Sequence, residues 1–426
     1  MGGPPMRLRN FCLMVFCGLI LCLIGSVSAT PAEGPSAERM LARMDTDGDG
    51  RIAKEEWLGQ PHVFRNFDLN KDGVLTRDEI DIFLDRRRKN SPSGQNKSSQ
   101  IIDWIDVHVH PAAGAKNADY SGVVQDIAKT INETAMVGAV LMPTPQNAAR
   151  WRLEDFLNEA KNYSGRLAFL GGGGTLNPMI HEEARDGVVS SELAQRFRRR
   201  AEEILALGAV GFGEIAGLHL SFSFDHPFES VPADHPLLLL LADIAAEHDV
   251  VIDFHNELIV KDIKTPEWLS SPANPPSLIK NIDGLERLLD HNIKAKIIWA
   301  HAGSDNVGHW TVDVSRRLLT AHPNLYMSLR MGAGQGDATA KMNHPIGAGG
   351  ILRPEWRQLL IDFPDRFVLG GDQFFTAPFS SGAASRYSGY AEKIRRRTDH
   401  FLTLLPPQVA RKIGYENAIA LYKLNR

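Results

Sequence analysis

Cysteine is nearly absent from this chain. Its 426 residues include only three cysteines, and all of them (Cys12, Cys17 and Cys22) lie within the first 29 residues. If that segment is removed, the remaining chain has no thiol. That excludes disulfide bonds, a cysteine nucleophile and cysteine-type zinc sites.

A strong excess of one charge is lacking as well. The formal net charge is −4, with 23% charged and 43% hydrophobic residues. This balance is typical of a globular protein and excludes a disordered or collagen-like chain. It gives no electrostatic argument for nucleic acid. We therefore expect a small-molecule substrate and no nucleic-acid partner, and the sequence does not specify an oligomeric state.

The long apolar run at the N-terminus is too short for an ordinary membrane span. Residues 11–25 are apolar, they follow Arg7 and Arg9, and the small residues 26–29 come next. A membrane span needs about 20 apolar residues, whereas this arrangement is typical of a secretory signal. The sequence predicts that residues 1–29 are a cleaved signal peptide of a secreted or periplasmic protein. An uncleaved membrane anchor is the alternative.

Composition divides the rest of the chain into two parts. Residues 37–89 contain two acidic, glycine-containing repeats, residues 90–100 are polar and apolar-poor and are typical of a linker, and a different pattern fills residues 101–426. Short apolar runs alternate there with longer amphipathic stretches, such as 191–207 and 236–248. The runs that we expect to be strands are 105–110, 138–142, 168–171, 210–215, 250–255, 296–301, 325–329 and 367–371.

Eight such units favour one closed barrel over an open sheet. Continuous apolar runs are typical of parallel strands that are buried on both faces, and eight β/α units in about 320 residues fit a (β/α)8 barrel. The predicted fold class is therefore α/β, a TIM barrel with a small all-α module before it.

Both acidic repeats match the twelve-residue EF-hand loop. Loop positions 1, 3, 5, 7 and 12 supply oxygen ligands to calcium, with a glycine at position 6 for the turn. The expected ligands are Asp45, Asp47, Asp49, the Arg51 carbonyl and Glu56 in the first loop, and Asp68, Asn70, Asp72, the Val74 carbonyl and Glu79 in the second. Ile52 and Leu75 at position 8 are expected to pair across the loops. We expect two calcium sites with a structural or docking role.

The most specific chemical signal in the barrel is the segment Asp-Val-His-Val-His-Pro at 106–111. Side chains alternate along a strand, so His108 and His110 lie on one face and can bind one metal ion together. Active sites of such barrels lie at the C-terminal ends of the strands, where this segment is placed.

Other polar residues interrupt apolar strands at the same depth. Glu214, His255, His301 and Asp372 each stand at a strand end, and these ends converge in a barrel. A divalent cation would offset the cost of burying such charges together. The other histidines lack this placement and are expected at the surface or in structural roles.

In these motifs, residues 101–424 resemble the amidohydrolase superfamily, and in particular its amidohydrolase-related branch, which also contains decarboxylases. The resemblance implies that His108, His110 and His255 are metal ligands. It implies that Asp372 binds the metal and takes a proton from the nucleophilic water. His301 would be a second-metal ligand or a polarising acid/base.

The number of metal ions depends on the fourth predicted strand, residues 210–215. No lysine occurs from residue 162 to 260, so the carbamylated-lysine variant of the superfamily is excluded there. Glu214 takes the place of a bridging glutamate used elsewhere in the superfamily, and it is either a bridging ligand or a substrate-facing carboxylate. A salt bridge in the barrel mouth is the alternative. We expect one or two transition-metal ions, with zinc as the first candidate.

The resulting hypothesis is a metal-dependent hydrolase that directs an activated water at an amide, ester or lactone carbonyl. A decarboxylase on the same site is the first alternative, and a calcium-dependent docking or surface protein with a silent barrel is the second. Arg330 stands at the end of the seventh predicted strand, residues 325–329. It can bind a substrate carboxylate, or it forms a structural ion pair.

Overall fold

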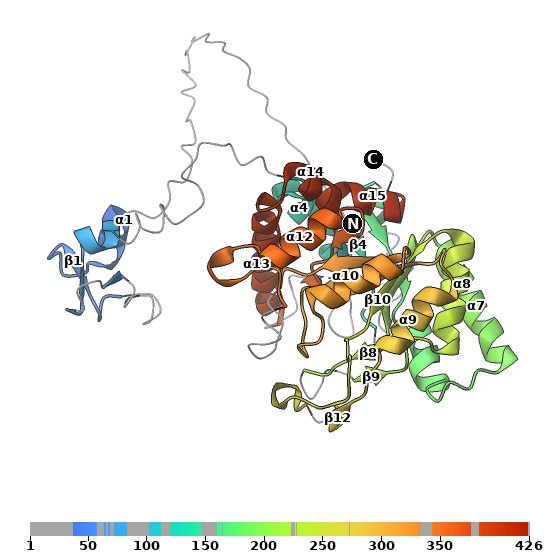
Figure 1. Ribbon diagram of the computed structural model, residues 1–426. Helices are drawn as coiled ribbons and strands as arrows, with labels where there is room; N and C mark the ends of the chain where they lie inside the picture. The colour runs from blue at the N-terminus through green and yellow to red at the C-terminus, as the bar shows by residue number, and fades with distance from the viewer. Residues whose placement is uncertain are drawn as a thin grey trace, which may run out of the picture. The chain divides into compact units, whose positions relative to one another are not determined.

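The computed structural model describes residues 37–57, 64, 67–68, 72–82, 102–111, 120–145, 160–163, 165–222, 226, 228–271, 273–332, 343–375 and 383–424. The chain divides into two compact units, Met1–Ser98 and Ser99–Arg426 (Figure 1). The expected signal peptide at 1–29, the linker at 90–100 and the ligand Asn70 lie outside the described residues. Among those described, no helix has both the length and the apolarity to cross a membrane.

The described part of the N-terminal unit has helical residues at 77–82 besides one longer helix and a pair of short strands. The longer helix is α1 (Ala37–Met44), and the strands are β1 (Arg51–Ala53) and β2 (Val74–Thr76). β1 and β2 are antiparallel, and Ile52 lies opposite Leu75. The predicted contact between the two loops is therefore confirmed. Both side chains are fully buried. The small sheet joins the two loops, and it is an addition to the helical module that the sequence predicted.

The second unit is a closed barrel of parallel strands. Its strands are β3 (Trp104–Pro111), β4 (Met136–Leu141), β5 (Leu167–Phe169), β6 (Gly171–Gly172), β7 (Gly211–Ala216), β10 (Val251–His255), β13 (Lys296–Ala302), β14 (Leu325–Leu329) and β15 (Phe367–Leu369). Their order in the sheet is β5-β4-β3-β15-β14-β13-β10-β7-β6. Only Leu170 separates β5 from β6, so these two are halves of one strand and the sheet closes into a ring of eight. The predicted (β/α)8 barrel is confirmed.

Further short strands accompany the eight strands of the ring. β16 (Gln373–Phe375) continues alongside β3. Two antiparallel pairs lie outside the ring. They are formed by β8 (Leu218–His219) with β9 (Glu229–Ser230), and by β11 (Ile263–Lys264) with β12 (Ser277–Leu278).

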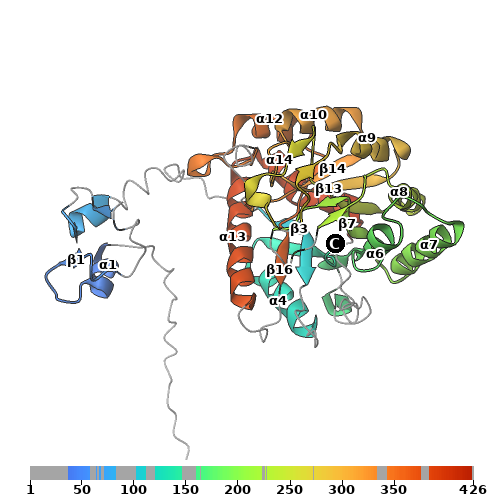
Figure 2. The ribbon, with the colours of Figure 1, turned by 90° about the horizontal axis from the view of Figure 1, so that it is seen from below.

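Helices surround the strands, as the view in Figure 2 shows. They are α4 (Tyr120–Glu133), α6 (Leu176–Pro178), α7 (Ser191–Ala206), α8 (Pro236–His248), α9 (Ile282–His291), α10 (Val312–Ala321), α12 (Pro354–Asp362), α13 (Ala383–Thr403), α14 (Pro407–Arg411) and α15 (Asn417–Tyr422).

Local sequence explains where the helices begin and end. The side chain of Ser190 accepts a hydrogen bond from the Leu193 amide and caps α7. α8 begins with Pro236, which lacks an amide proton and suits the first turn. It ends at Asp249 in the left-handed conformation (φ 53°), a common helix stop.

The core lies in two layers. The larger cluster packs the strands against the helices, with fully buried Phe197, Leu241 and Trp356. A smaller cluster joins strand side chains such as Val251 to Tyr422 of α15. Val251 is the first residue of β10, so α15 packs toward the N-terminal ends of the strands and leaves the C-terminal ends to other groups.

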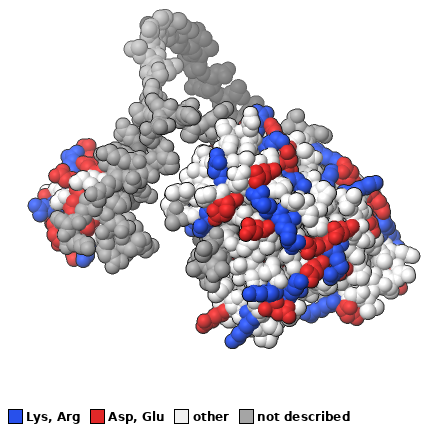
Figure 3. Space-filling model, viewed as in Figure 1, with Lys and Arg blue, Asp and Glu red and all other residues white. Residues whose placement is uncertain are grey.

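Charges are mixed on the face of the molecule seen in Figure 3, where acidic and basic side chains lie side by side on the barrel unit. Ion pairs also link charged side chains of this unit; Arg198 lies 2.6 Å from Glu247, and Arg316 lies 2.6 Å from Asp362. Exposed pairs of this kind contribute at most about 1 kcal/mol each.

Candidate metal centre

The polar strand ends converge on one point of the barrel. His108 and His110 come from β3, Glu214 from β7, His255 from β10 and His301 from β13, while Asp372 follows β15. All six are buried or nearly so. The structure thus brings together all six residues that the sequence predicted as transition-metal ligands.

The first two histidines point their free nitrogens at each other. Nδ1 of His110 lies 3.1 Å from the Met142 carbonyl oxygen, and Nδ1 of His108 lies 3.2 Å from Oδ2 of Asp253. Both oxygens are acceptors, so both Nδ1 atoms donate, and either ring in its neutral form presents a lone pair at Nε2. These two Nε2 atoms are only 3.1 Å apart. Two facing lone pairs are stabilised when a cation lies between them.

Two carboxylates complete this group. Oδ1 of Asp372 lies 3.3 Å from Nε2 of His110, and Oε2 of Glu214 lies 3.4 Å from the same nitrogen. Tetrahedral bonds of about 2.0–2.1 Å to zinc place neighbouring ligand atoms about 3.3 Å apart. The donor set and its spacing therefore fit a transition-metal ion. We call His108, His110, Asp372 and Oε2 of Glu214 the first half-site.

The other oxygen of Glu214 belongs to a second group. Oε1 lies 2.6 Å from Nδ1 of His255 and 3.2 Å from Nε2 of His301, and those two nitrogens are 3.1 Å apart. We call this group the second half-site. One carboxylate thus faces both half-sites, which is the position of a bridging ligand.

Electrostatics of the centre follow from burial and from its carboxylates. Burial opposes the charge of His108, but Asp253 and Glu214 outweigh it and raise its pKa well above the usual value. Burial also opposes the charge of His255, yet Glu214 raises its pKa to about 10. Burial lowers the pKa of His301 to about 3. Without a metal the centre attracts protons to some of its rings.

Two of these residues have unusual backbone. His301 has φ 70° and Asp372 has φ 50°, in the left-handed region that residues other than glycine rarely occupy. Such positions cost about 1–3 kcal/mol each and gather at functional sites. The fold holds both side chains toward the centre at that cost.

Arg330 lies beside the centre and is engaged by the protein itself. Its Nη2 lies 3.0 Å from Oδ2 of Asp372 and donates a hydrogen bond to the Tyr390 hydroxyl at 3.0 Å. The guanidinium therefore holds one oxygen of Asp372, and the pKa of that carboxyl lies well below its usual range although burial opposes the shift. This contact is the ion pair that the sequence predicted as an alternative. The Nε atom of Arg330 has no hydrogen-bond partner among the described residues, and binding of a substrate carboxylate stays a prediction.

Sequence reasoning missed two neighbours of the centre. Asp253 is fully buried against His108, and the signal was a charged residue inside an apolar strand. His219 was expected at the surface or in a structural role. It is buried, and its ring centre lies 4.7 Å from that of His255. Nothing in the local sequence of His219 indicates that contact.

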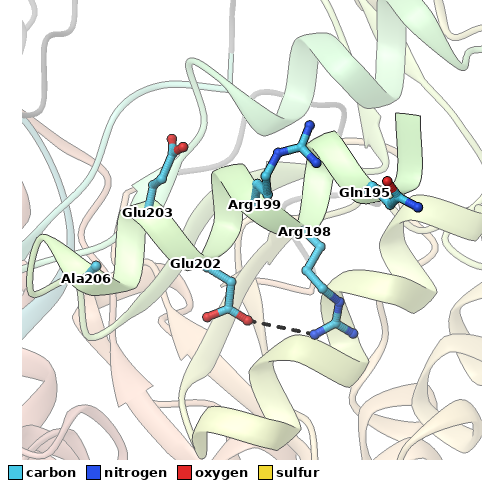
Figure 4. A pocket seen from close by; sticks show the side chains of 6 residues that line it. All are labelled: Gln195, Arg198, Arg199, Glu202, Glu203 and Ala206. Atoms are coloured by element: carbon cyan, nitrogen blue, oxygen red, sulfur yellow. Dashed lines mark ion pairs between the residues drawn. The ribbon is translucent and has the colours of Figure 1, made fainter. Parts of the chain in front are cut away.

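A hollow elsewhere on the barrel unit lies along α7 (Figure 4). Its lining residues are Gln195, Arg198, Arg199, Glu202, Glu203 and Ala206. Arg198 and Glu202 form an ion pair there at 3.8 Å. All six residues come from one helix and none ends a strand, so this hollow is separate from the metal centre.

The EF-hand loops also gather their acidic side chains. Donor oxygens of Asp45, Asp47 and Glu56 lie within 4.8 Å of one another. Hydrogen bonds from backbone amides, with Ala53 first, lower the pKa of Glu56 to about 2. In the second loop, Oδ1 of Asp68 is buried with no hydrogen-bond partner among the described residues. Both loops present oxygens suited to calcium.

Comparison with known proteins identifies both units. The sequence model of the amidohydrolase family matches residues 105–424, and the EF-hand model matches residues 38–58 and 62–84. A transaldolase from Thermosynechococcus vestitus is 44% identical over 45 residues, which is 11% of this chain and 12% of the transaldolase.

Two solved structures are similar to the barrel at low identity. One is a probable 2-pyrone-4,6-dicarboxylic acid hydrolase from Acinetobacter baumannii with citric acid bound (13% identity, 76% of this chain and 100% of the other, TM-score 0.42). The other is a dihydroxybenzoic acid decarboxylase from Polaromonas with bound manganese and 2-nitroresorcinol (16% identity, 76% and 98%, TM-score 0.42).

Proposed function

The chain belongs to the amidohydrolase family, and on that premise we propose that it is a metal-dependent hydrolase acting on an amide, ester or lactone carbonyl. One observation carries the proposal. The Nε2 atoms of His108 and His110 face each other at 3.1 Å, with Asp372 beside them. Six donors converge there, and oxygen and nitrogen ligands of this kind suit zinc or manganese.

The residues of the metal centre would have the following roles in the reaction. A bound transition metal supplies Lewis acidity and makes water a nucleophile near neutral pH. Oδ1 of Asp372 faces the first half-site and would accept the proton of the attacking water, while Arg330 fixes Oδ2. The proton then passes to the leaving group. Nε2 of His301 points at Glu214 and His255, which favours a ligand role in the second half-site.

Isotope labelling tests the reaction class. The metal-loaded protein is incubated with ester, lactone, amide and aromatic or unsaturated carboxylic acid substrates in H₂¹⁸O. Hydrolysis incorporates ¹⁸O into the product carboxylate and releases no carbon dioxide. Release of carbon dioxide would show the decarboxylase alternative instead. A protein that binds no transition metal and turns over no substrate would leave the EF-hand unit as the functional part.

Glu214 decides the number of metal ions, and we propose that it bridges two of them. In Glu214→Gln, the amide keeps one acceptor oxygen and cannot join the half-sites. We expect the transition-metal content under excess metal to fall from two equivalents to one, measured by plasma mass spectrometry. Glu203→Gln, an exposed change on α7, is the matched control. Two equivalents retained in Glu214→Gln would make Glu214 a substrate-facing carboxylate.

We propose that both EF-hand loops bind calcium. Glu56 and Glu79 occupy the position that binds calcium through both oxygens. Each change, Glu56→Gln or Glu79→Gln, is expected to remove one of two calcium equivalents in isothermal titration calorimetry. The neighbouring changes Glu55→Gln and Asp78→Asn should leave both. Equal calcium binding in all four variants would overturn the assignment.

Secretion directed by residues 1–29, and docking of a partner by the EF-hand unit, belong to the same proposal. The mass of the protein recovered from the secreting host checks the first point, since cleavage after Ala29 removes a defined segment.

A further inference from the structure

The ligands of the first half-site are held from behind by other groups. Both oxygens of Asp253 lie near Nδ1 of His108, at 3.1 and 3.2 Å. His110 donates to the Met142 carbonyl, and Asp372 is held by Arg330. His108, His110 and Asp372 therefore have their orientation fixed before any metal binds. Partners of this kind also make an imidazole a better ligand.

The second half-site lacks this support. Nδ1 of His301 is buried and has no hydrogen-bond partner among the described residues. Nε2 of His255 lies 3.8 Å from Glu257, beyond hydrogen-bonding distance. Its histidines are also more open to solvent, with His255 11% and His301 8% exposed where His108 is 0% and His110 2% exposed.

Asp253 distinguishes the first half-site from the second in charge as well as in geometry. It lies in β10, two residues before His255, yet it turns to His108 on β3. The carboxylate is fully buried, and a buried carboxylate is stable only when a cation or hydrogen bonds offset its charge. A cation bound by His108 would provide that offset. The second half-site has no such carboxylate behind a histidine within hydrogen-bonding distance among the described residues.

We propose that Asp253 is a positioning residue that makes the two half-sites unequal, so that the first binds a transition-metal ion more tightly and the second fills afterwards. This inference rests on the metal centre of the proposed function. Loss of such a partner typically weakens metal binding by about 10–100-fold, and we expect the two affinities to differ by at least about the lower figure.

Metal titration tests the proposal without any substrate. The metal-free full chain is titrated with zinc against a chromophoric chelator, with calcium in excess to occupy the EF-hand loops. We expect two phases of one equivalent each. Asp253→Asn should weaken the tight phase about 10–100-fold and leave the weak phase in place.

Asp249→Asn is the matched control. Asp249 precedes the same strand, is exposed and pairs with Lys296 and Lys423 at 2.6 and 2.9 Å, and asparagine tolerates its left-handed backbone. This variant should titrate like the parent. Thermal unfolding of each metal-free variant shows whether the fold is kept.

A second variant keeps the test decisive if Asp253→Asn does not fold. His301→Ala should remove the weak phase and leave the tight phase unchanged. A single phase of two equal equivalents in the parent protein would overturn the proposal, as would loss of the tight phase in His301→Ala. Absence of any zinc binding would instead overturn the proposed function itself.

Discussion

The double variant His108→Ala/His110→Ala is expected to lose the transition metal of the first half-site and the proposed activity with it. These residues supply two converging nitrogens of the first half-site, 3.1 Å apart and fully enclosed by the barrel. Removing an outer partner alone costs about 10–100-fold in affinity, and removing two ligands leaves Asp372 and Glu214 without nitrogen partners in that half-site. Plasma mass spectrometry of protein purified without chelator measures the loss.

The same sample contains its own internal control. Calcium should remain at the parental level, because the EF-hand loops lie in the other unit of the chain. A second control, His248→Ala/His291→Ala, removes two histidines from helix ends outside the centre and should keep all its metal. Parental zinc content in the His108/His110 variant would mean that the metal is bound elsewhere.

The variant Asp372→Asn is expected to lower kcat by about 10²–10⁴-fold, the usual contribution of a general base. An amide has no basic oxygen to receive the proton of water. Its carbonyl can still accept from Arg330, so the side chain keeps its place and KM should change little. Steady-state kinetics on the substrate found by isotope labelling measures both constants.

Asp365→Asn is the matched control for this variant. Asp365 lies just before β15, on the surface, and pairs with Lys412. Its replacement should leave kcat and KM unchanged. If Asp372→Asn changed only KM, Asp372 would contribute to substrate binding and another group would take the proton.

The strands of the barrel could be predicted because each is a separate apolar run. The run expected at 325–329 is β14 to the residue, and the amphipathic stretch 236–248 is α8 to the residue. Burial on both faces leaves such a signal in a few consecutive residues. The run at 168–171 was less accurate, since the structure breaks it at Leu170 into β5 and β6.

The candidate ligands could also be predicted, because burying a histidine or an acid at the end of an apolar strand is costly unless a cation or another partner offsets that cost. The residues that contact these ligands could not be predicted. The contact of Asp253 with His108 joins residues 145 positions apart, and that of Arg330 with Asp372 depends on how β14 and β15 pair. The left-handed backbone of His301 and Asp372 leaves no mark in their own residue types. These features arise from the closed ring and not from local sequence.

The closing of the ring sets an order of events during synthesis. β3 comes from residues 104–111 and pairs with β15, which comes from residues 367–369. A ribosome must therefore make more than 250 further residues after β3 before the two strands can meet. During that interval His108 and His110 have no Asp372 beside them, and half-built barrels expose apolar surface. A metal ion that needs Asp372 as well as His108 and His110 would therefore bind only after translation of the barrel is essentially complete.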